Sequence, residues 1–83
     1  MKVQVRYFAS VREALGAGEM LDVPQAASVA QIRQTLSERS AAHAQALDRR
    51  HAVRAALDHV MCGEDAIARE GSEVAFFPPV TGG

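Results

Sequence analysis

The sequence predicts an α+β domain in which a mixed β-sheet packs on one main helix. Residues 3–7 alternate between the two faces of a strand, and residues 74–77 form a short apolar run with aromatic side chains, a composition typical of strands. A capped amphipathic segment, residues 29–39, lies between them. With 83 residues, 48% of them hydrophobic, the chain supports one small core.

The first strand is predicted over residues 3–7. Val3, Val5 and Tyr7 share one of its faces and are expected to point into the core, because neighbouring strand residues point to opposite sides. Phe8 falls on the other face.

A short helix and a return strand are predicted next. Ser10 is expected to cap a helical turn that Gly16 ends. The second strand covers residues 19–23 and closes at Pro24. The two strands are therefore expected to form a hairpin with a long connection.

The main helix is predicted over residues 29–39. Ser28, followed three residues later by Gln31, matches a capping box. Three apolar residues recur at helical spacing and are expected to face the sheet: Val29, Ile32 and Leu36. Three polar residues are expected to be solvated: Arg33, Gln34 and Glu38.

The rest of the chain predicts one weaker helix and three more strands. The helix is expected around residues 44–47, in an alanine-rich segment. Strands at 53–57 and 60–62 are joined by a turn at Asp58-His59, where aspartate is common. Ile67 is expected to anchor the small core between two turns, and the last strand covers residues 74–77.

The last strand leads into an ending with almost no side-chain bulk. Pro78 and Pro79 lack the N–H that a central ladder needs and favour an extended course. From Val80 to Gly83 the chain reaches roughly 13 Å when extended. This ending suits insertion into a narrow channel on another protein, and we expect it to order only there; the alternative is a terminus without a function.

Three large apolar residues are predicted on the sheet face that does not pack on the helix. Phe8 points away from Val5 and Tyr7, and the other two are Met61 and Phe77. Large apolar residues gathered on the outside of a small domain indicate a partner surface. The alternative is that a bulge or the short helical elements cover them.

Composition argues against several classes of function. A net charge of −1 offers no electrostatic surface for nucleic acid. No apolar run reaches the length of a membrane span, and no signal sequence is visible. The single cysteine, Cys62, excludes an internal disulfide, which fits a reduced cytoplasmic protein.

No catalytic or metal-binding constellation is visible in the sequence. The three histidines, His43, His51 and His59, are spread over a weak helix, its flank and a turn, and nothing pairs them with Cys62. Cys62 is expected to pack as a small hydrophobe. The carboxylate of Gly83 is therefore the reactive group best placed for use.

Both ends of the chain resemble a known family. The ending from Glu73 to Gly83, with its core Phe-Phe-Pro-Pro-Val-Thr-Gly-Gly, is similar to that of molybdopterin synthase small subunits, which are ubiquitin-like sulfur carriers. The start, residues 3–13, resembles the first strand and turn of that family, and the likeness is looser between Gly16 and Met61. The resemblance implies a β-grasp, ubiquitin-like domain over residues 1–79 and a flexible Gly-Gly tail over residues 80–83.

The resemblance also implies a function. A ubiquitin-activating-like adenylyltransferase, using ATP, would adenylylate Gly83, and a sulfur donor would convert it to a thiocarboxylate. The sulfur would pass to cyclic pyranopterin monophosphate inside the large subunit of molybdopterin synthase, in a heterotetramer. The chain would be a non-catalytic donor without a cofactor of its own. Gly82 would give the tail access, and the implied partner-binding residues are Phe8, Met61, Phe77, Pro78, Pro79, Val80 and Thr81.

Other functions share these sequence features. A sulfur carrier for thiamine biosynthesis or tRNA thiolation would also end in Gly-Gly on this fold. A ubiquitin-like modifier that forms isopeptide bonds is a different class. A third is an interaction module whose Gly82-Gly83 ending does nothing.

Overall fold

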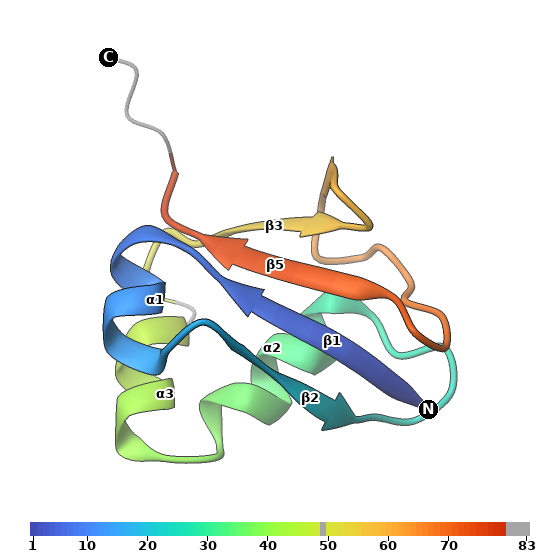
Figure 1. Ribbon diagram of the computed structural model, residues 1–83, viewed down its shortest axis with the longest axis horizontal. Helices are drawn as coiled ribbons and strands as arrows, with labels where there is room; N and C mark the ends of the chain where they lie inside the picture. The colour runs from blue at the N-terminus through green and yellow to red at the C-terminus, as the bar shows by residue number, and fades with distance from the viewer. Residues whose placement is uncertain (49, 80–83) are drawn as a thin grey trace.

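The computed structural model describes residues 1–48 and 50–79 (Figure 1). The strands are β1 (Lys2–Tyr7), β2 (Gly18–Asp22), β3 (Arg54–Leu57), β4 (Val60–Cys62) and β5 (Glu73–Phe77). The helices are α1 (Ala9–Leu15), α2 (Val29–Ser37) and α3 (Ala41–Leu47). The predicted α+β class is confirmed. The predicted tail, residues 80–83, lies outside the described residues.

β5 occupies the middle of a five-stranded sheet with the order β2-β1-β5-β3-β4. It runs parallel to β1 and antiparallel to β3, so the sheet is mixed as predicted. The register places Phe76 between Tyr7 and Ala55. The predicted hairpin is also confirmed: β1 and β2 pair antiparallel, with α1 in their connection. Figure 1 shows the C-terminal end of β5 beside α1, far from the N-terminus.

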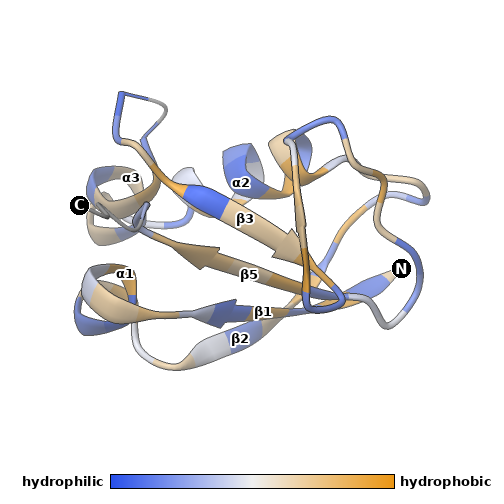
Figure 2. Ribbon diagram, turned by 90° about the horizontal axis from the view of Figure 1, so that it is seen from above, coloured by the Kyte–Doolittle hydropathy of each residue, from blue (hydrophilic) through white to orange (hydrophobic). Residues whose placement is uncertain are grey.

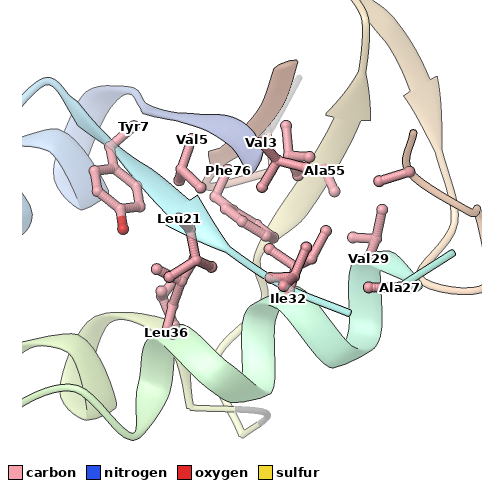
Figure 3. Packing of buried hydrophobic residues seen from close by; sticks show 14 of the residues in the cluster. Val3, Val5, Tyr7, Leu21, Ala27, Val29, Ile32, Leu36, Ala55 and Phe76 are labelled. Carbon is pink, nitrogen blue, oxygen red and sulfur yellow. The ribbon is translucent and has the colours of Figure 1, made fainter. Parts of the chain in front are cut away.

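α2 covers one face of the sheet and forms the core with it. The predicted capping box is present: the Ser28 hydroxyl accepts the Gln31 N–H at 3.1 Å, and the Ser28 N–H donates to Oε1 of Gln31 at 2.8 Å. Figure 3 shows Ile32 and Leu36 of α2 pointing toward the strands. The fully buried side chains that meet there include Val3, Val5, Tyr7, Val29, Ile32, Leu36, Val74 and Phe76.

α2 ends at Ser37, two residues before the predicted end. The N–H groups of Glu38 and Arg39 donate to the carbonyls of Thr35 and Leu36, at 3.3 and 3.0 Å. This three-residue spacing tightens the last turn into a 3₁₀ form, which commonly ends a helix.

α1 begins at Ala9 rather than after Ser10, so the predicted cap is wrong. Phe8 is the N-cap residue and provides no side-chain hydrogen bond, while Ser10 lies inside the helix. The chain turns from β1 into α1 at Ala9, which has a φ of 52°. The predicted stop at Gly16 is confirmed, with φ at 94° and its N–H bonded to the Arg12 carbonyl.

α3 is longer than predicted because it has its own cap. The Ser40 hydroxyl accepts the N–H of His43 at 3.1 Å and starts the helix at Ala41. Leu47, in its last turn, is fully buried. Serine before a run of helix-forming residues was the sequence signal for this start.

Arg33 is buried, although the sequence pattern predicted it to be solvated. Only 6% of its surface is exposed. Its guanidinium donates to the carbonyls of Leu47 (2.8 Å), Asp48 (2.8 Å) and His51 (3.0 Å) and pairs with the Glu64 carboxylate. The planar fork of an arginine can serve several acceptors at once. Arg33 therefore ties α2 to the end of α3, to the segment that leads into β3 and to the loop after β4.

A second polar network joins β2 to α3 at the edge of the core. The Tyr7 hydroxyl donates to Oε2 of Glu19 at 2.7 Å, His43 Nε2 lies 2.9 Å from the same oxygen, and Arg39 lies 3.2 Å from Oε1. Burial alone would raise the pKa of Glu19, but the hydrogen bonds from His43 and Tyr7 and the charge of Arg39 together hold it below its usual value. Burial, with the Glu19 hydrogen bond, raises the pKa of Tyr7 far above its usual value.

Ile67 does not anchor the core, so this prediction is wrong. Its side chain is 51% exposed, whereas that of Ala68 is 1% exposed. Ile67 forms an isolated bridge with Ser28, and the N–H of Ala68 donates to the Ala27 carbonyl at 2.9 Å. In this extended pairing adjacent residues point to opposite sides, so the small Ala68 faces inward and Ile67 faces out.

Replacing Arg33 with methionine is expected to lower the free energy of unfolding by about 3 kcal/mol, because three carbonyls, that of Leu47 buried, and a carboxylate lose their donor. Arg33→Lys should recover only part of the lost stability, because its ammonium keeps the positive charge but cannot serve all the acceptors of the planar guanidinium. Urea denaturation measures both, with the exposed Arg12→Met as control, expected within about 0.5 kcal/mol of wild type. An Arg33→Met protein as stable as this control would contradict the role of the network.

The network around Glu19 predicts an acid-dependent loss of stability. A carboxylate whose pKa is lowered on folding contributes stability that is fully present above its unfolded pKa, about 4.3 for glutamate, and is lost as pH falls through the lower folded pKa. Wild type should therefore exceed Glu19→Gln in stability at pH 7, and the difference should shrink below about pH 4. Denaturant unfolding of both proteins across this range measures the difference; a gap independent of pH would argue against it.

Candidate functional site

The end of β5 fixes where the C-terminal segment leaves the domain. Phe76 is fully buried in the core and its carbonyl accepts the N–H of Phe8 at 3.1 Å. The ladder to β3 ends where Phe77 pairs with Arg54. Pro78 follows and has no N–H to extend it. The exit therefore lies at the end of the central strand. Four predicted site residues lie outside the described residues: Val80, Thr81, Gly82 and Gly83.

The sheet face opposite α2, called here the outer face, carries the three predicted apolar residues. Ala75 pairs with Ala56, and Ala56 pairs with Met61, so these residues cross the sheet in one row. Met61 is 59% exposed. Phe8 is exposed and Phe77 is half-buried. Figure 2 shows hydrophilic segments beside hydrophobic ones on β3 and β1, whereas the β5 arrow between them is coloured hydrophobic.

An open hollow of about 500 Å³ lies in the outer face. Its floor is formed by Ala56 and Ala75, whose small side chains leave room between larger neighbours. Its lining residues are Arg6, Phe8, Ala9, Ala56, His59, Glu73, Ala75, Phe77 and Pro78. The structure thus brings Phe8, Phe77 and Pro78 together at the exit of β5, while Met61 lies one strand beyond the hollow.

Three ionisable residues of the hollow were not predicted as site residues. One carboxylate oxygen of Glu73 lies 3.9 Å from the Arg6 guanidinium and the other lies 3.5 Å from Nε2 of His59. These residues come from β1, from β5 and from the turn after β3, so only the strand pairing brings them together. Three further apolar residues among those described are also exposed: Met20, Val60 and Ile67. Val60 shares a face with Leu57 but lies on the outermost strand.

A second hollow, of about 350 Å³, lies on the other side of the exit, between α1 and α3. Val11 and Ala14 of α1 line it, together with Ala42 and Ala46 of α3. Pro78 lines both hollows. The chain therefore leaves the sheet between two depressions of the surface.

The described residues hold no cluster of three metal-ligating side chains. His43 belongs to the Glu19 network, and Cys62 is half-buried. Burial, with a smaller contribution from Asp65, raises the pKa of the Cys62 thiol, which disfavours the thiolate. None of the helices within residues 1–48 and 50–79 is long and apolar enough to cross a membrane.

Solved structures share this fold along its full length. SAMP1 from Haloferax volcanii superposes with a TM-score of 0.77 at 25% identity and covers 100% of both chains. A chain from the protein–protein complex of subunit 1 and 2 of molybdopterin-converting factor from Helicobacter pylori 26695 gives a TM-score of 0.68 at 21% identity, with 100% of both chains covered. The fold is the predicted β-grasp, ubiquitin-like fold.

Sequence comparison identifies the family to which the chain belongs. The profile of the ThiS family matches residues 5–83. The molybdopterin synthase sulfur carrier subunit of Escherichia coli (strain K12) is 36% identical over 81 residues, which is 98% of this chain and 99% of the relative. That of Haemophilus influenzae (strain ATCC 51907 / DSM 11121 / KW20 / Rd) is 33% identical over the same lengths. These matches confirm the resemblance seen at the two ends of the sequence: the chain belongs to the ThiS family, among the relatives of the molybdopterin synthase sulfur carrier subunits.

Proposed function

We propose that this chain is the sulfur carrier subunit of a molybdopterin synthase and that Gly83 carries the sulfur. The observation that supports it most directly is the place of β5. This strand is held on both edges, ends at Phe77 and is followed by Pro78 and Pro79, of which Pro78 lines the outer-face hollow. The chain therefore leaves the sheet at a fixed point, next to a surface that a partner can cover.

The chemistry at Gly83 requires activation by another protein. A carboxylate is a poor acyl donor, so the adenylyltransferase joins it to the AMP part of ATP and releases pyrophosphate. The terminal sulfur of a persulfide on the donor protein then attacks the acyl carbon, AMP leaves, and an acyl disulfide to the donor is formed. A second thiol cleaves its S–S bond, which releases the thiocarboxylate and leaves that thiol in a disulfide with the donor. The chain itself needs no cofactor for these steps. Glycine at 82 and 83 lets the backbone approach a nucleotide or pterin closely.

The large subunit of molybdopterin synthase is the proposed acceptor of the tail. A structural relative from Helicobacter pylori is described as a complex of subunits 1 and 2 of molybdopterin-converting factor. We infer that a large subunit covers the outer face here, in a heterotetramer in the cytoplasm. Its catalytic groups would act on cyclic pyranopterin monophosphate, with this chain as the sulfur donor. The residues proposed to guide the tail are Pro78, Pro79, Val80, Thr81 and Gly82.

A carrier for thiamine biosynthesis or tRNA thiolation stays the alternative. Such a carrier would share the fold, the family and the activation of Gly83. The acceptor protein distinguishes the two functions: the proposed one requires a stable complex with the large subunit of molybdopterin synthase.

Phe77→Ala and Met61→Ala are expected to weaken binding of the large subunit by about tenfold each, because central apolar side chains dominate interfaces. Both side chains lie on the outer face, so their removal should lower stability less than the core change Val5→Ala, which removes roughly 2 kcal/mol of buried apolar contact. Calorimetric titration gives the dissociation constants, and urea denaturation gives the stabilities.

Val60→Ala is a matched control for Met61→Ala. Val60 is the neighbour of Met61 on β4 and is also exposed, but it points to the opposite side of the sheet. Its removal should leave the dissociation constant within about twofold of wild type. Loss of stability from Phe77→Ala and Met61→Ala as large as that from Val5→Ala would show that these residues belong to the core.

Deleting Gly83 is expected to abolish sulfur transfer while leaving the complex intact. The terminal carbon would retreat by about 3.5 Å, one extended residue, whereas attack needs the reacting atoms within roughly 3–3.5 Å. The outer face is unchanged, so affinity for the large subunit should be retained. Co-purification with that subunit measures binding, and molybdopterin synthesis from chemically thiocarboxylated protein measures transfer.

Gly83→Ala distinguishes the effect of tail length from the effect of side-chain size in the same assay. It keeps the length of the tail and adds one methyl group, so it should impair transfer to the degree that the channel is narrow. Full activity of the shortened protein would overturn the assignment of the terminal carboxylate as the sulfur-carrying group.

A further inference from the structure

The turn between β3 and β4 holds two residues in the left-handed region of backbone space. Asp58 has a φ of 49° and His59 a φ of 70°, and the flanking Leu57 and Val60 pair with each other. Two-residue hairpin turns of this kind favour asparagine or aspartate first and glycine second. Asp58 fits this preference, but a histidine in the second position meets the steric conflict that glycine avoids.

The first turn residue has a structural role that explains its presence. The carboxylate of Asp58 accepts the N–H of Glu73 at 2.9 Å and the hydroxyl of Ser72 at 3.4 Å. The N–H of Asp58 donates to the Glu73 carbonyl at 2.8 Å. These bonds tie the turn to the start of β5 and do not involve the imidazole of His59.

The imidazole instead lies at the rim of the outer-face hollow. It is 80% exposed, and its Nε2 lies 3.5 Å from Oε2 of Glu73. The other Glu73 oxygen faces Arg6 of β1 at 3.9 Å. The charged and titratable groups around His59 are thus Glu73 of β5, Arg6 of β1 and Asp58 of its own turn, while β3 contributes Ala56 to the hollow. The carboxylate of Glu73 is flanked on both sides by groups that can be positive.

We propose that His59, in its protonated form, and Arg6 bind an acidic side chain of the partner that covers the hollow. This inference rests on the proposed function, because it requires a partner on the outer face. Among the residues that line the hollow, Arg6 and a charged His59 outnumber the single carboxylate of Glu73. The Asp58 carboxylate lies outside this lining and accepts hydrogen bonds from Ser72 and from the Glu73 N–H. When a partner covers the row formed by Arg6, Glu73 and His59, water is removed from these groups, and an uncompensated charge is costly to bury. A carboxylate on the partner offsets the excess charge and makes the contact specific.

The sign of the pH dependence follows from this arrangement. Histidine side chains change charge between about pH 5 and 8, and the complex is favoured by the charged form. Affinity for the partner should therefore rise as pH falls through this range. A cationic partner residue over the same row would give the opposite slope.

The test is calorimetric titration of the chain with the molybdopterin synthase large subunit of the same organism, between pH 5.5 and 8. Wild type should bind about fivefold more tightly than His59→Asn at pH 5.5, and the two dissociation constants should converge at pH 8. Asparagine accepts the left-handed backbone but cannot be charged, so the comparison cancels the titration of all other groups. His59→Gly should unfold at a higher temperature than wild type because its backbone is unstrained, yet bind more weakly at pH 5.5.

Two outcomes would overturn the inference: parallel pH profiles for wild type and His59→Asn, or a wild-type advantage that grows toward pH 8. Phe77→Ala in the same titrations separates this inference from the proposed function. If Phe77→Ala weakens binding at every pH while His59→Asn matches wild type, only the role of His59 is wrong. If Phe77→Ala binds as wild type does, the outer face is not the interface and both proposals fail.

Discussion

The pairing of β5 with β1 on one edge and β3 on the other is the constraint on which the rest of the structure depends. β5 follows every other described element in sequence yet lies in the middle of the sheet, so the sheet is complete only when both ends of the chain meet. Val74 and Phe76 of β5 are also fully buried against the helix side. A strand held on two edges and from one face cannot shift along its axis without breaking all three sets of contacts. The exit at Pro78 is therefore fixed relative to the outer face.

Because side chains alternate along β5, the residues that stabilise the core differ from those that face the proposed partner. Val74 and Phe76 contribute to the core, whereas Ala75 and Phe77 face the other side of the sheet. Ala75 and its neighbour Ala56 are small, so the outer face is hollowed where a row of large residues would have made a ridge. Because the two sets of side chains share only the backbone, changes on the outer face affect the core little. This separation is what allows binding and folding to be measured apart in one short strand.

Local patterns predicted most of the elements. The errors at the starts of α1 and α3 are local, whereas the burial of Arg33 and the exposure of Ile67 depend on non-local contacts. The capping box at Ser28, the strand alternation and the hairpin all depend on neighbours within a few residues, and they were correct. Arg33 was assigned to solvent because it is polar and lies beside the apolar stripe of α2. Its burial depends on carbonyls at Leu47, Asp48 and His51, which α3 brings within reach only after it packs on α2. For the site, alternation placed Phe8, Met61 and Phe77 on the outer face. The Arg6–Glu73–His59 row needed the register of strands that are far apart in sequence.

Backbone strain gathers where the outer face is hollowed. Four non-glycine residues among those described have a positive φ, namely Ala9, Ala26, Asp58 and His59, and two of them, Ala9 and His59, line the hollow. Such conformations each cost on the order of 1 kcal/mol and persist where the surrounding structure determines them. At Ala9 the strain turns the chain sharply out of β1, directly after Phe8 at the rim. At His59 it holds an imidazole beside Glu73, while the bonds of Asp58 hold the turn in place. Contacts elsewhere, above all the α2 core and the Arg33 network, offset these costs. The rim of the hollow thus includes two residues in a backbone conformation that glycine would adopt at a lower cost. This pattern is expected where the side chains, and not only the fold, are needed for recognition.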